Sequence, residues 1–432
     1  MPILLTNATL LELASPRVEH ADLRIKHGVI IERARHLKPK ADEPVFDLVG
    51  KYVMAGMVCG HTHLYSALAR GMPPPKKAPR NFYEILKYVW WKLDRALDEE
   101  AIYYSALVGA LDAVRCGTTT LIDHHASPNF IRGSLNVMKE ALLEVGLRAV
   151  LCYETTDRNG MQGARQGMEE NLEWVSKNRG PMFGGLVGAH ASFTLGDKSL
   201  QWCGYAARHS KSGVHIHVAE DPCDQADCTK KYRMPLIERL LKAGVLGPKT
   251  ILGHCTHLDR RSLDLAKRTG CWFAHNTRSN MNNAVGYAPV HLMGRRVALG
   301  TDGIGADMFE EVKFAWFKAR DSRNGLGIGA VADFLVGAQS LASVLLNVQL
   351  GVLDVGYAAD LIVLDYPTPT KITSQNPFGH LIFGLSSQCV TDTMVNGQWI
   401  VRNRKVVGVD EESVREKSQK VADKVWKRFK AL

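Results

Sequence analysis

Two histidines, His61 and His63, close an apolar run that begins at Val53. Side chains alternate between the two faces of an extended strand, so both imidazoles are expected to point the same way. Gly60 stands directly before them and leaves space beside the backbone. Two imidazoles on one face can bind one metal ion, although the same pattern also closes ordinary strands. The pair therefore predicts a metal site only if other parts of the chain supply further ligands.

Other apolar runs also end in side chains that can bind metals or transfer protons. The chain has 16 histidines, and many of them fall at such ends, which chance alone would not produce. The residues at these ends are His124, His125, His190, His217, Glu220, His254, His275, Asn276 and Asp302.

Three imidazoles and one carboxylate could hold a divalent cation: His61, His63, His217 and Asp302. A bound metal lowers the pKa of water from 15.7 to about 7, which suits hydrolysis of an electrophilic sp² carbon. Glu220 follows His217 by three residues, so it could transfer protons without being a ligand. His254 could reach the water or the substrate. Asp302 also lies in a Thr-Asp-Gly sequence, which is common in simple turns.

The remaining candidates concern substrate contacts. His124 and His125 are adjacent and point in opposite directions on a strand, so at most one faces the site, and we favour His125. We interpret His215 as a packing residue deeper in the fold. Trp90 falls in a helical stretch after a proline-rich loop, where it either joins the core or covers a planar ring.

The repeated order of segments indicates how these residues are brought together. Eight strand-like runs are followed by helical sequence, the last helix covering residues 330–347, and this pattern is typical of a (β/α)8 TIM barrel. Catalytic groups in such a barrel lie at the carboxyl ends of the strands. The predicted strands are 54–61, 118–125, 147–154, 185–190, 213–220, 249–255, 270–276 and 296–302.

Strand-like sequence also flanks the barrel on both sides. Residues 1–54 indicate short antiparallel strands, and residues 353–410 contain further strands with turns at Gly356 and Asn396-Gly397. Each piece alone is too small to bury a face, so we expect one composite β-sandwich built from both chain ends. The α/β barrel would then cover residues 55–352, and an amphipathic terminal helix would cover residues 411–432.

Composition and charge narrow the class of protein. Hydrophobic residues make up 46% of the chain and charged residues 23%, as in soluble globular proteins. The net charge is +10, but residues 402–432 hold ten Lys/Arg and five Asp/Glu, so half of the excess lies in this C-terminal segment. We therefore expect no nucleic-acid partner and, since no long apolar run is evident, no membrane partner. Nine scattered cysteines and no signal peptide favour the cytoplasm.

Five motifs together resemble the metal-dependent amidohydrolase superfamily, in its cytosine/guanine deaminase and triazine hydrolase branch. They are GHTH, HIHVAED, LGHCTH, AHNTRSNMNN and GTDGIGADMFEE. Within that branch the chain is most similar to the SsnA-type aminohydrolases, through WWKLDRALDEE, IDHHASP, YETTDRN, HNTRSNMNNAVGY and DGIGADMFEEVKFAWFK. The resemblance extends over nearly the whole chain and implies the same fold.

The resemblance also implies roles for individual residues. It makes His61, His63, His217 and Asp302 the metal ligands, with Glu220 as the proton shuttle. It makes His254 the group that polarises the attacked carbon or orients the nucleophile, and it makes His190 a substrate contact. Two-metal relatives usually carry a modified lysine where this chain has His190, so one divalent ion is implied, zinc in preference to iron.

These observations predict a metal-dependent hydrolytic deaminase that releases ammonia from a planar, amino-substituted N-heterocycle resembling a purine or pyrimidine. Catalysis would depend on Glu220, His254 and Asp302, with His190, His125 and Trp90 contacting the substrate. Two alternatives remain open: a related hydrolase that cleaves a ring amide or a C–Cl bond, and a non-catalytic binding module with the same fold. We also expect a homo-oligomer, namely a dimer.

Overall fold

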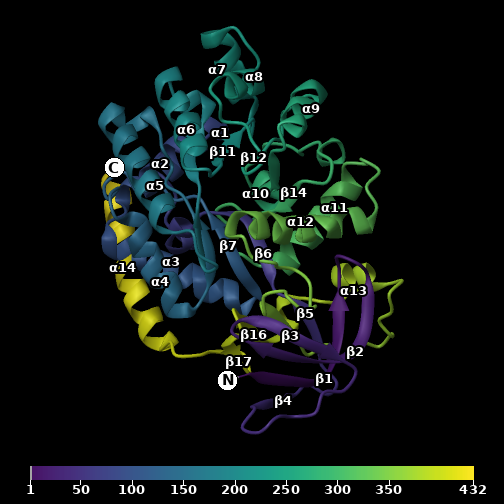
Figure 1. The fold of residues 1–432 in the computed structure, drawn as a ribbon. Helices are drawn as coiled ribbons and strands as arrows, with labels where there is room; N and C mark the ends of the chain where they lie inside the picture. The colour runs from purple at the N-terminus through teal and green to yellow at the C-terminus, as the bar shows by residue number, and fades with distance from the viewer. Residues whose placement is uncertain (1) are drawn as a thin grey trace.

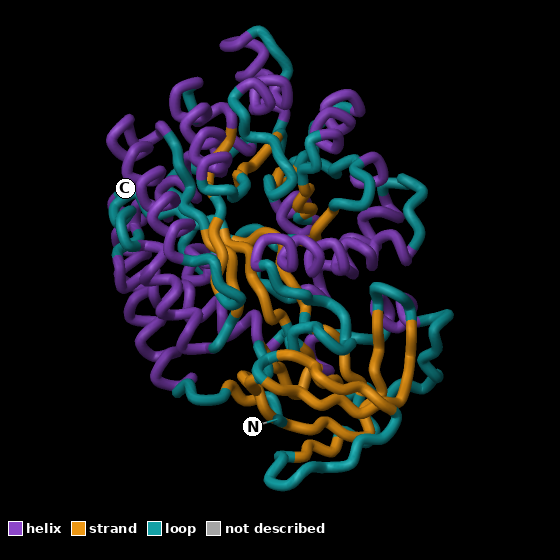
Figure 2. Tube along the Cα trace, viewed as in Figure 1, coloured by secondary structure: helices purple, strands orange, loops and turns teal. Residues whose placement is uncertain are grey.

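The structure, a computed structural model, describes residues 2–432. Most helices surround two parallel β-sheets, and a third, larger sheet lies at the other end of the molecule (Figure 1, Figure 2). The strands are β1 (Ile3–Glu12), β2 (Arg17–Lys26), β3 (Val29–Ala34), β4 (Val45–Asp47), β5 (Tyr52–Ala55), β6 (Met57–Thr62), β7 (Thr118–Asp123), β8 (Arg148–Leu151), β9 (Phe183–Gly185), β10 (Val187–Ala191), β11 (Val214–Val218), β12 (Ile251–His254), β13 (Trp272–His275), β14 (Val297–Leu299), β15 (Leu361–Leu364), β16 (Val390–Val395), β17 (Gln398–Arg402) and β18 (Lys405–Val406).

The helices range in length from 4 residues in the shortest to 21 residues in the longest. They are α1 (Phe82–Ile85), α2 (Trp91–Ala96), α3 (Glu99–Arg115), α4 (Ser134–Val145), α5 (Gly160–Lys177), α6 (Asp197–His209), α7 (Pro222–Tyr232), α8 (Leu236–Lys242), α9 (Arg260–Arg268), α10 (Thr277–Asn282), α11 (Met308–Asp321), α12 (Ile328–Leu346), α13 (Pro377–Phe383) and α14 (Glu411–Ala431).

The two parallel sheets have the strand orders β6-β7-β8-β9 and β10-β11-β12-β13-β14. The sequence run predicted as one strand over 185–190 takes part in both sheets, because β9 pairs with β8 while β10 pairs with β11. At the other edges, an isolated parallel bridge joins Thr62 to Asp302. Strand-helix alternation with parallel sheets is the architecture of a TIM-barrel type protein, so the predicted α/β class is confirmed.

Gly60 explains how β6 lies against β14. A Cβ atom at Gly60 would lie 2.8 Å from the Cβ of Ala298 and 2.9 Å from the carbonyl oxygen of Leu299. Any side chain at this position would therefore push the two strands apart. The close approach lets the Asp302 N–H donate a hydrogen bond of 3.0 Å to the carbonyl of His61, which brings the ends of both strands together.

Helix α12 packs against β14 and β6 and corresponds to the last helix predicted from the sequence. It is long and apolar enough to cross a membrane, although the sequence analysis expected no such run. Half of its apolar window is buried inside the protein, as in core helices of soluble proteins, so this finding is a weak indication of a membrane span.

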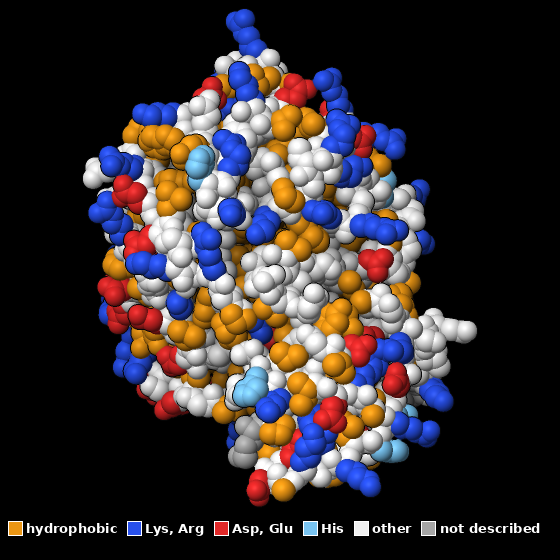
Figure 3. All heavy atoms as spheres, in the orientation of Figure 1, with side chains coloured by type: hydrophobic (Ala, Val, Ile, Leu, Met, Phe, Trp, Pro, Cys, Tyr) orange, Lys and Arg blue, Asp and Glu red, His pale blue; other side chains and the backbone are white. Residues whose placement is uncertain are grey.

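Lys and Arg side chains are scattered among acidic and apolar ones on the face drawn in Figure 3.

The third sheet contains strands from both chain ends, in the order β18-β17-β16-β15-β5-β1-β2-β3, with β4 paired to β1. The expected antiparallel pairing is found for β1 with β2 and for β2 with β3, whereas β1 pairs in parallel with β4 and β5. A bidentate ion pair of 2.8 Å per contact joins Asp360, just before β15, to Arg148 of β8. Helix α14 lies along α2 and α3 on the outer side of the molecule (Figure 1).

Candidate active site and metal centre

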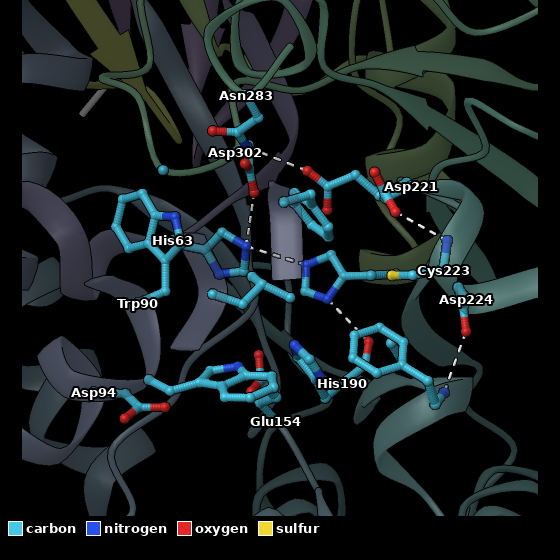
Figure 4. Close-up of a pocket in the computed structure, with 18 of the residues that line it drawn as sticks. His63, Trp90, Asp94, Glu154, His190, Asp221, Cys223, Asp224, Asn283 and Asp302 are labelled. Carbon is cyan, nitrogen blue, oxygen red and sulfur yellow. Dashed lines mark hydrogen bonds and ion pairs between the residues drawn. The ribbon is translucent and has the colours of Figure 1, made fainter. Parts of the chain in front are cut away.

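Four side chains from three strand ends converge on one point. Asp302 Oδ1 lies 2.9 Å from His63 Nε2 and 3.2 Å from His61 Nε2. His217 Nε2 lies 3.2 Å from His63 Nε2. One potential ligand atom from each of these four residues falls within 4.8 Å of the others. The structure therefore brings together the whole predicted ligand set, as Figure 4 shows for His63 and Asp302.

The second nitrogen of each imidazole is occupied by a hydrogen bond. His63 Nδ1–H donates to the carbonyl of His124 at 2.5 Å, and His217 Nδ1–H donates to the carbonyl of His190 at 2.9 Å. His61 Nδ1 lies 2.8 Å from His215 Nε2. The carbonyl acceptors require a proton on Nδ1 of His63 and His217, so the Nε2 atoms of these two rings face the centre of the group. This arrangement is the one that fits a divalent metal ion.

Electrostatics also fits a cation at this point. Burial lowers the pKa of His63, but the hydrogen bond and charge of Asp302 outweigh it and raise that pKa to about 9. Burial raises the pKa of Asp302, yet its hydrogen bonds with His61 and His63 hold it well below the usual range. The carboxylate thus stays charged and attracts a cation, and a metal must displace a proton to bind.

Glu220 and His254 lie beside this group without belonging to it. His254 Nε2 is 3.4 Å from Glu220 Oε2 and 4.0 Å from Asp302 Oδ1. Burial raises the pKa of Glu220 above its usual range, which brings a carboxyl group closer to the range needed for proton transfer near neutral pH. The backbones of His254 and Asp302 have φ values of +64° and +55°, a strained conformation that occurs preferentially at functional sites.

A cavity opens beside these residues and is walled by aromatic and acidic side chains (Figure 4). Trp90, Trp91, Phe82, Leu86 and Phe193 form apolar walls. Within residues 2–432, no Lys or Arg is among the lining residues. The carboxylate residues of the lining are Asp94, Glu154, Glu220, Asp221, Asp224 and Asp302. An apolar slot with acidic polar groups can hold a planar ring that is neutral or cationic.

Of the three residues predicted to contact substrate, Trp90 and His190 line this cavity. The structure does not bring His125 to it. His125 Nε2 is 2.8 Å from the hydroxyl of Ser127, and the lining of the cavity does not include it. The neighbouring His124 turns inward instead, with its Nδ1 3.5 Å from Glu154 Oε2. Strand alternation misplaced the pair because β7 ends at Asp123, before either histidine.

Two groups in the site were missed by sequence reasoning. His215 contacts His61, although we interpreted it as packing; its position two residues before His217 on the same face of β11 was a usable signal. The second is Arg158, whose Nη2 bonds Glu154 Oε1 at 2.7 Å and Asp94 Oδ2 at 3.1 Å behind the cavity wall. Glu154 and Arg158 are four residues apart, but nothing in the local sequence joins them to Asp94.

Comparison with known proteins gives one family match and many relatives. A model described as "Amidohydrolase family" matches residues 52–400. The chain is 29% identical to a 5'-deoxyadenosine deaminase of Methanopyrus kandleri, covering 86% of each chain. It is 27% identical to a 5-methylthioadenosine/S-adenosylhomocysteine deaminase of Pyrococcus furiosus, covering 94% of this chain and 96% of the relative. A zinc-bound adenosine deaminase structure from Xanthomonas campestris superposes with a TM-score of 0.82 at 20% identity, covering 98% of both chains.

Proposed function

This chain belongs to the amidohydrolase family, and from that premise we propose that it is a metal-dependent hydrolytic deaminase of a planar, amino-substituted N-heterocycle. The observation that carries the proposal is the convergence of His61, His63, His217 and Asp302 beside Glu220 and His254. The names of the relatives, which are deaminases of adenosine derivatives, support the same reaction and favour a purine-like ring.

His61, His63, His217 and Asp302 are proposed to hold one divalent ion, and zinc is favoured because the Xanthomonas campestris structure contains it. When bound, such an ion acidifies water and so supplies a nucleophile at neutral pH. Each histidine would bind the ion through Nε2, since its Nδ1 is already engaged. Asp302 would contribute Oδ1, the oxygen that faces His61 and His63.

The remaining residues handle protons and hold the ring. Glu220 Oε2 faces the centre and is proposed to deliver a proton to a ring nitrogen, which makes the amino-bearing carbon electrophilic. His254 Nε2 orients the incoming oxygen nucleophile, and Asp302 accepts a proton that then leaves with ammonia. Trp90 and His190 contact the faces and edge of the ring from the cavity wall. Water adds, Glu220 recovers a proton from the new hydroxyl group as ammonia leaves, and the amidine carbon becomes a carbonyl.

The proposal includes a closed (β/α)8 barrel over residues 55–352, with a β-sandwich formed by residues 1–54 and 353–410 and a terminal helix over residues 411–432. The bridge between Thr62 and Asp302 supports closure of the barrel.

We also propose that the protein is a homodimer and that it is located in the cytoplasm. All nine cysteines are free, which agrees with a reducing compartment. Light scattering coupled to size-exclusion chromatography measures the oligomeric state.

The decisive experiment measures ammonia release from aminopurines, their nucleosides, aminopyrimidines and pterins. Glu220→Gln keeps the shape of the side chain but removes its proton transfer, so we expect at least a hundredfold lower kcat with unchanged zinc content. Zinc is measured by elemental analysis of the same samples. Turnover by Glu220→Gln at the wild-type rate contradicts the assigned role. Product mass separates deamination from ring opening or loss of chloride, which are the alternative hydrolytic reactions.

A further inference from the structure

Helix α10 (Thr277–Asn282) occupies a central place above the barrel strands. It begins two residues after β13 ends, and β13 lies between β12 and β14 in its sheet. His254 ends β12, and Asp302 follows β14. A helix above the middle strand can therefore reach functional residues on both neighbouring strands. The proposed function assigns no role to this helix or to the polar sequence SNMNN at residues 279–283. We call residues 277–283 the α10 segment.

Three side chains of this segment each contact one of the proposed proton-handling residues. The Ser279 hydroxyl donates a hydrogen bond of 2.5 Å to Asp302 Oδ2. His254 Nδ1–H donates to Asn280 Oδ1 at 2.8 Å. Asn283 Nδ2–H donates to Glu220 Oε1 at 3.3 Å, and Figure 4 shows Asn283 beside Asp302.

These contacts share one pattern. Each partner offers one polar atom to the centre of the site and the other to the α10 segment. Asp302 presents Oδ1 to the histidines and Oδ2 to Ser279. His254 presents Nε2 to Glu220, while its Nδ1 bonds Asn280. Glu220 presents Oε2 to His254, while its Oε1 bonds Asn283. The same segment thus determines which atom of each group faces the reaction.

Helical geometry and burial make this arrangement rigid. Ser279 and Asn283 are separated by about one turn of 3.6 residues and so lie on the same face, with Asn280 adjacent. Their exposed fractions are 3%, 8% and 2% for Ser279, Asn283 and Asn280. In the low dielectric of a buried site, hydrogen bonds of this kind hold their partners firmly.

The helix is itself anchored from behind. Arg278 Nε bonds Glu311 Oε2 on α11 at 2.5 Å, and the Arg278 N–H donates to Glu311 Oε1 at 3.2 Å. Arg278 Nη2 also donates to the carbonyl of Gly305, in the loop after β14, at 2.8 Å. Arg278 and Glu311 are buried, so α10 is fixed to both the neighbouring helix and the loop that follows Asp302.

We propose that the α10 segment is the positioning element of the site, with Ser279, Asn280 and Asn283 as positioning residues for Asp302, His254 and Glu220. This inference rests on the proposed function for the roles of those three partners. Asn280 requires the proton of His254 on Nδ1, which leaves Nε2 free to act towards the centre. Ser279 occupies Oδ2 of Asp302, which reserves Oδ1 for a metal.

The test compares variants that remove a contact with variants that keep it. Ser279→Ala and Asn280→Leu remove the hydroxyl and the acceptor, whereas Ser279→Thr and Asn280→Asp retain them. Met281→Ala is the matched control, because Met281 lies on the same helix with 44% of its surface exposed. The probe substrates are 5'-deoxyadenosine and adenosine, and the readouts are kcat, KM, zinc content and the optical absorption spectrum of the protein loaded with Co²⁺.

We expect Ser279→Ala and Asn280→Leu to lower kcat tenfold to a hundredfold with KM changed less than threefold, as for other residues that orient ligands and catalytic groups. Ser279→Thr and Asn280→Asp should recover most of the loss. Ser279→Ala should still bind one metal ion but change the Co²⁺ spectrum, since Asp302 can rotate. The inference is overturned if Ser279→Ala matches the Met281→Ala control in the Co²⁺ spectrum and, where turnover is measurable, in kcat.

The metal spectrum also separates this inference from the proposed function. If the wild-type protein binds Co²⁺ but releases no ammonia from either probe, the purine-like substrate favoured under the proposed function is contradicted. In that case the spectral comparison between Ser279→Ala, Ser279→Thr and Met281→Ala still decides whether Ser279 holds Asp302 in place.

Discussion

Replacing Arg278 by Met tests how strongly the site depends on the ion pair behind it. Glu311 is 0% exposed, and its partners are the Arg278 guanidinium and backbone N–H groups. Removing the guanidinium leaves a buried carboxylate without a counter-charge, which costs about 3–5 kcal/mol in comparable cases. We therefore expect Arg278→Met to lower the free energy of unfolding by about that amount at pH 8.

The pH dependence gives this prediction a second, independent component. Burial already raises the pKa of Glu311, and losing Arg278 raises it further. A carboxyl group whose pKa is higher in the folded state than in the unfolded state destabilises the protein as pH rises above the unfolded value of about 4.3. The difference between wild type and Arg278→Met should therefore be larger at pH 8 than at pH 5.5, by at most about 1.4 kcal/mol per pH unit.

Urea unfolding followed by tryptophan fluorescence measures these differences. The double variant Arg278→Met/Glu311→Leu removes both charges and should regain most of the stability, because two apolar side chains can replace a buried ion pair. Arg165→Met is the surface control, since its pair with Glu169 leaves Arg165 75% exposed and should contribute less than about 1 kcal/mol. The reasoning is refuted if Arg278→Met unfolds like Arg165→Met at both pH values.

Four further outcomes are expected. His61→Ala should lose zinc in elemental analysis, and unchanged zinc content counts against the ligand set. Because burial raises the pKa of Glu220 to about 7, kcat/KM should fall as pH rises above that value, since deprotonated Glu220 cannot deliver a proton to the ring nitrogen, and a pH profile of kcat/KM checks this. AMP should have at least tenfold lower kcat/KM than adenosine, because the acidic residues that line the cavity repel its phosphate group. Equal kcat/KM values for the two compounds would contradict this repulsion. Asp360→Ala leaves the buried Arg148 without its counter-charge, so the free energy of unfolding measured with urea should fall by about 3–5 kcal/mol.

The α/β class and the family were predicted from patterns among residues that are close in the sequence. The spacing of His61 and His63 depends only on the alternation of side chains along a strand. The α/β class follows from the repeated order of strand and helix, which neighbouring residues determine. The family followed from short motifs that the match over residues 52–400 confirms.

Local patterns predicted less where the regularity of a strand ends. The structure leaves His125 outside the lining of the cavity, because β7 stops at Asp123 and strand alternation no longer applies to the two histidines that follow. The antiparallel pairing expected within residues 1–54 holds for β1 with β2 but not for β1 with β4 and β5, because the sequence of a short strand does not determine its neighbours or their direction. Both cases arise where the path of the chain depends on distant segments.

The sequence by itself therefore determined the donor types at the strand ends and the order of the elements that carry them. Only the tertiary structure decided which donors meet, that His215 contacts His61, and that Ser279, Asn280 and Asn283 each hold a different functional residue. The physical reason is that ligand geometry depends on contacts between strands far apart in the chain, which have no local signal until the sheets form.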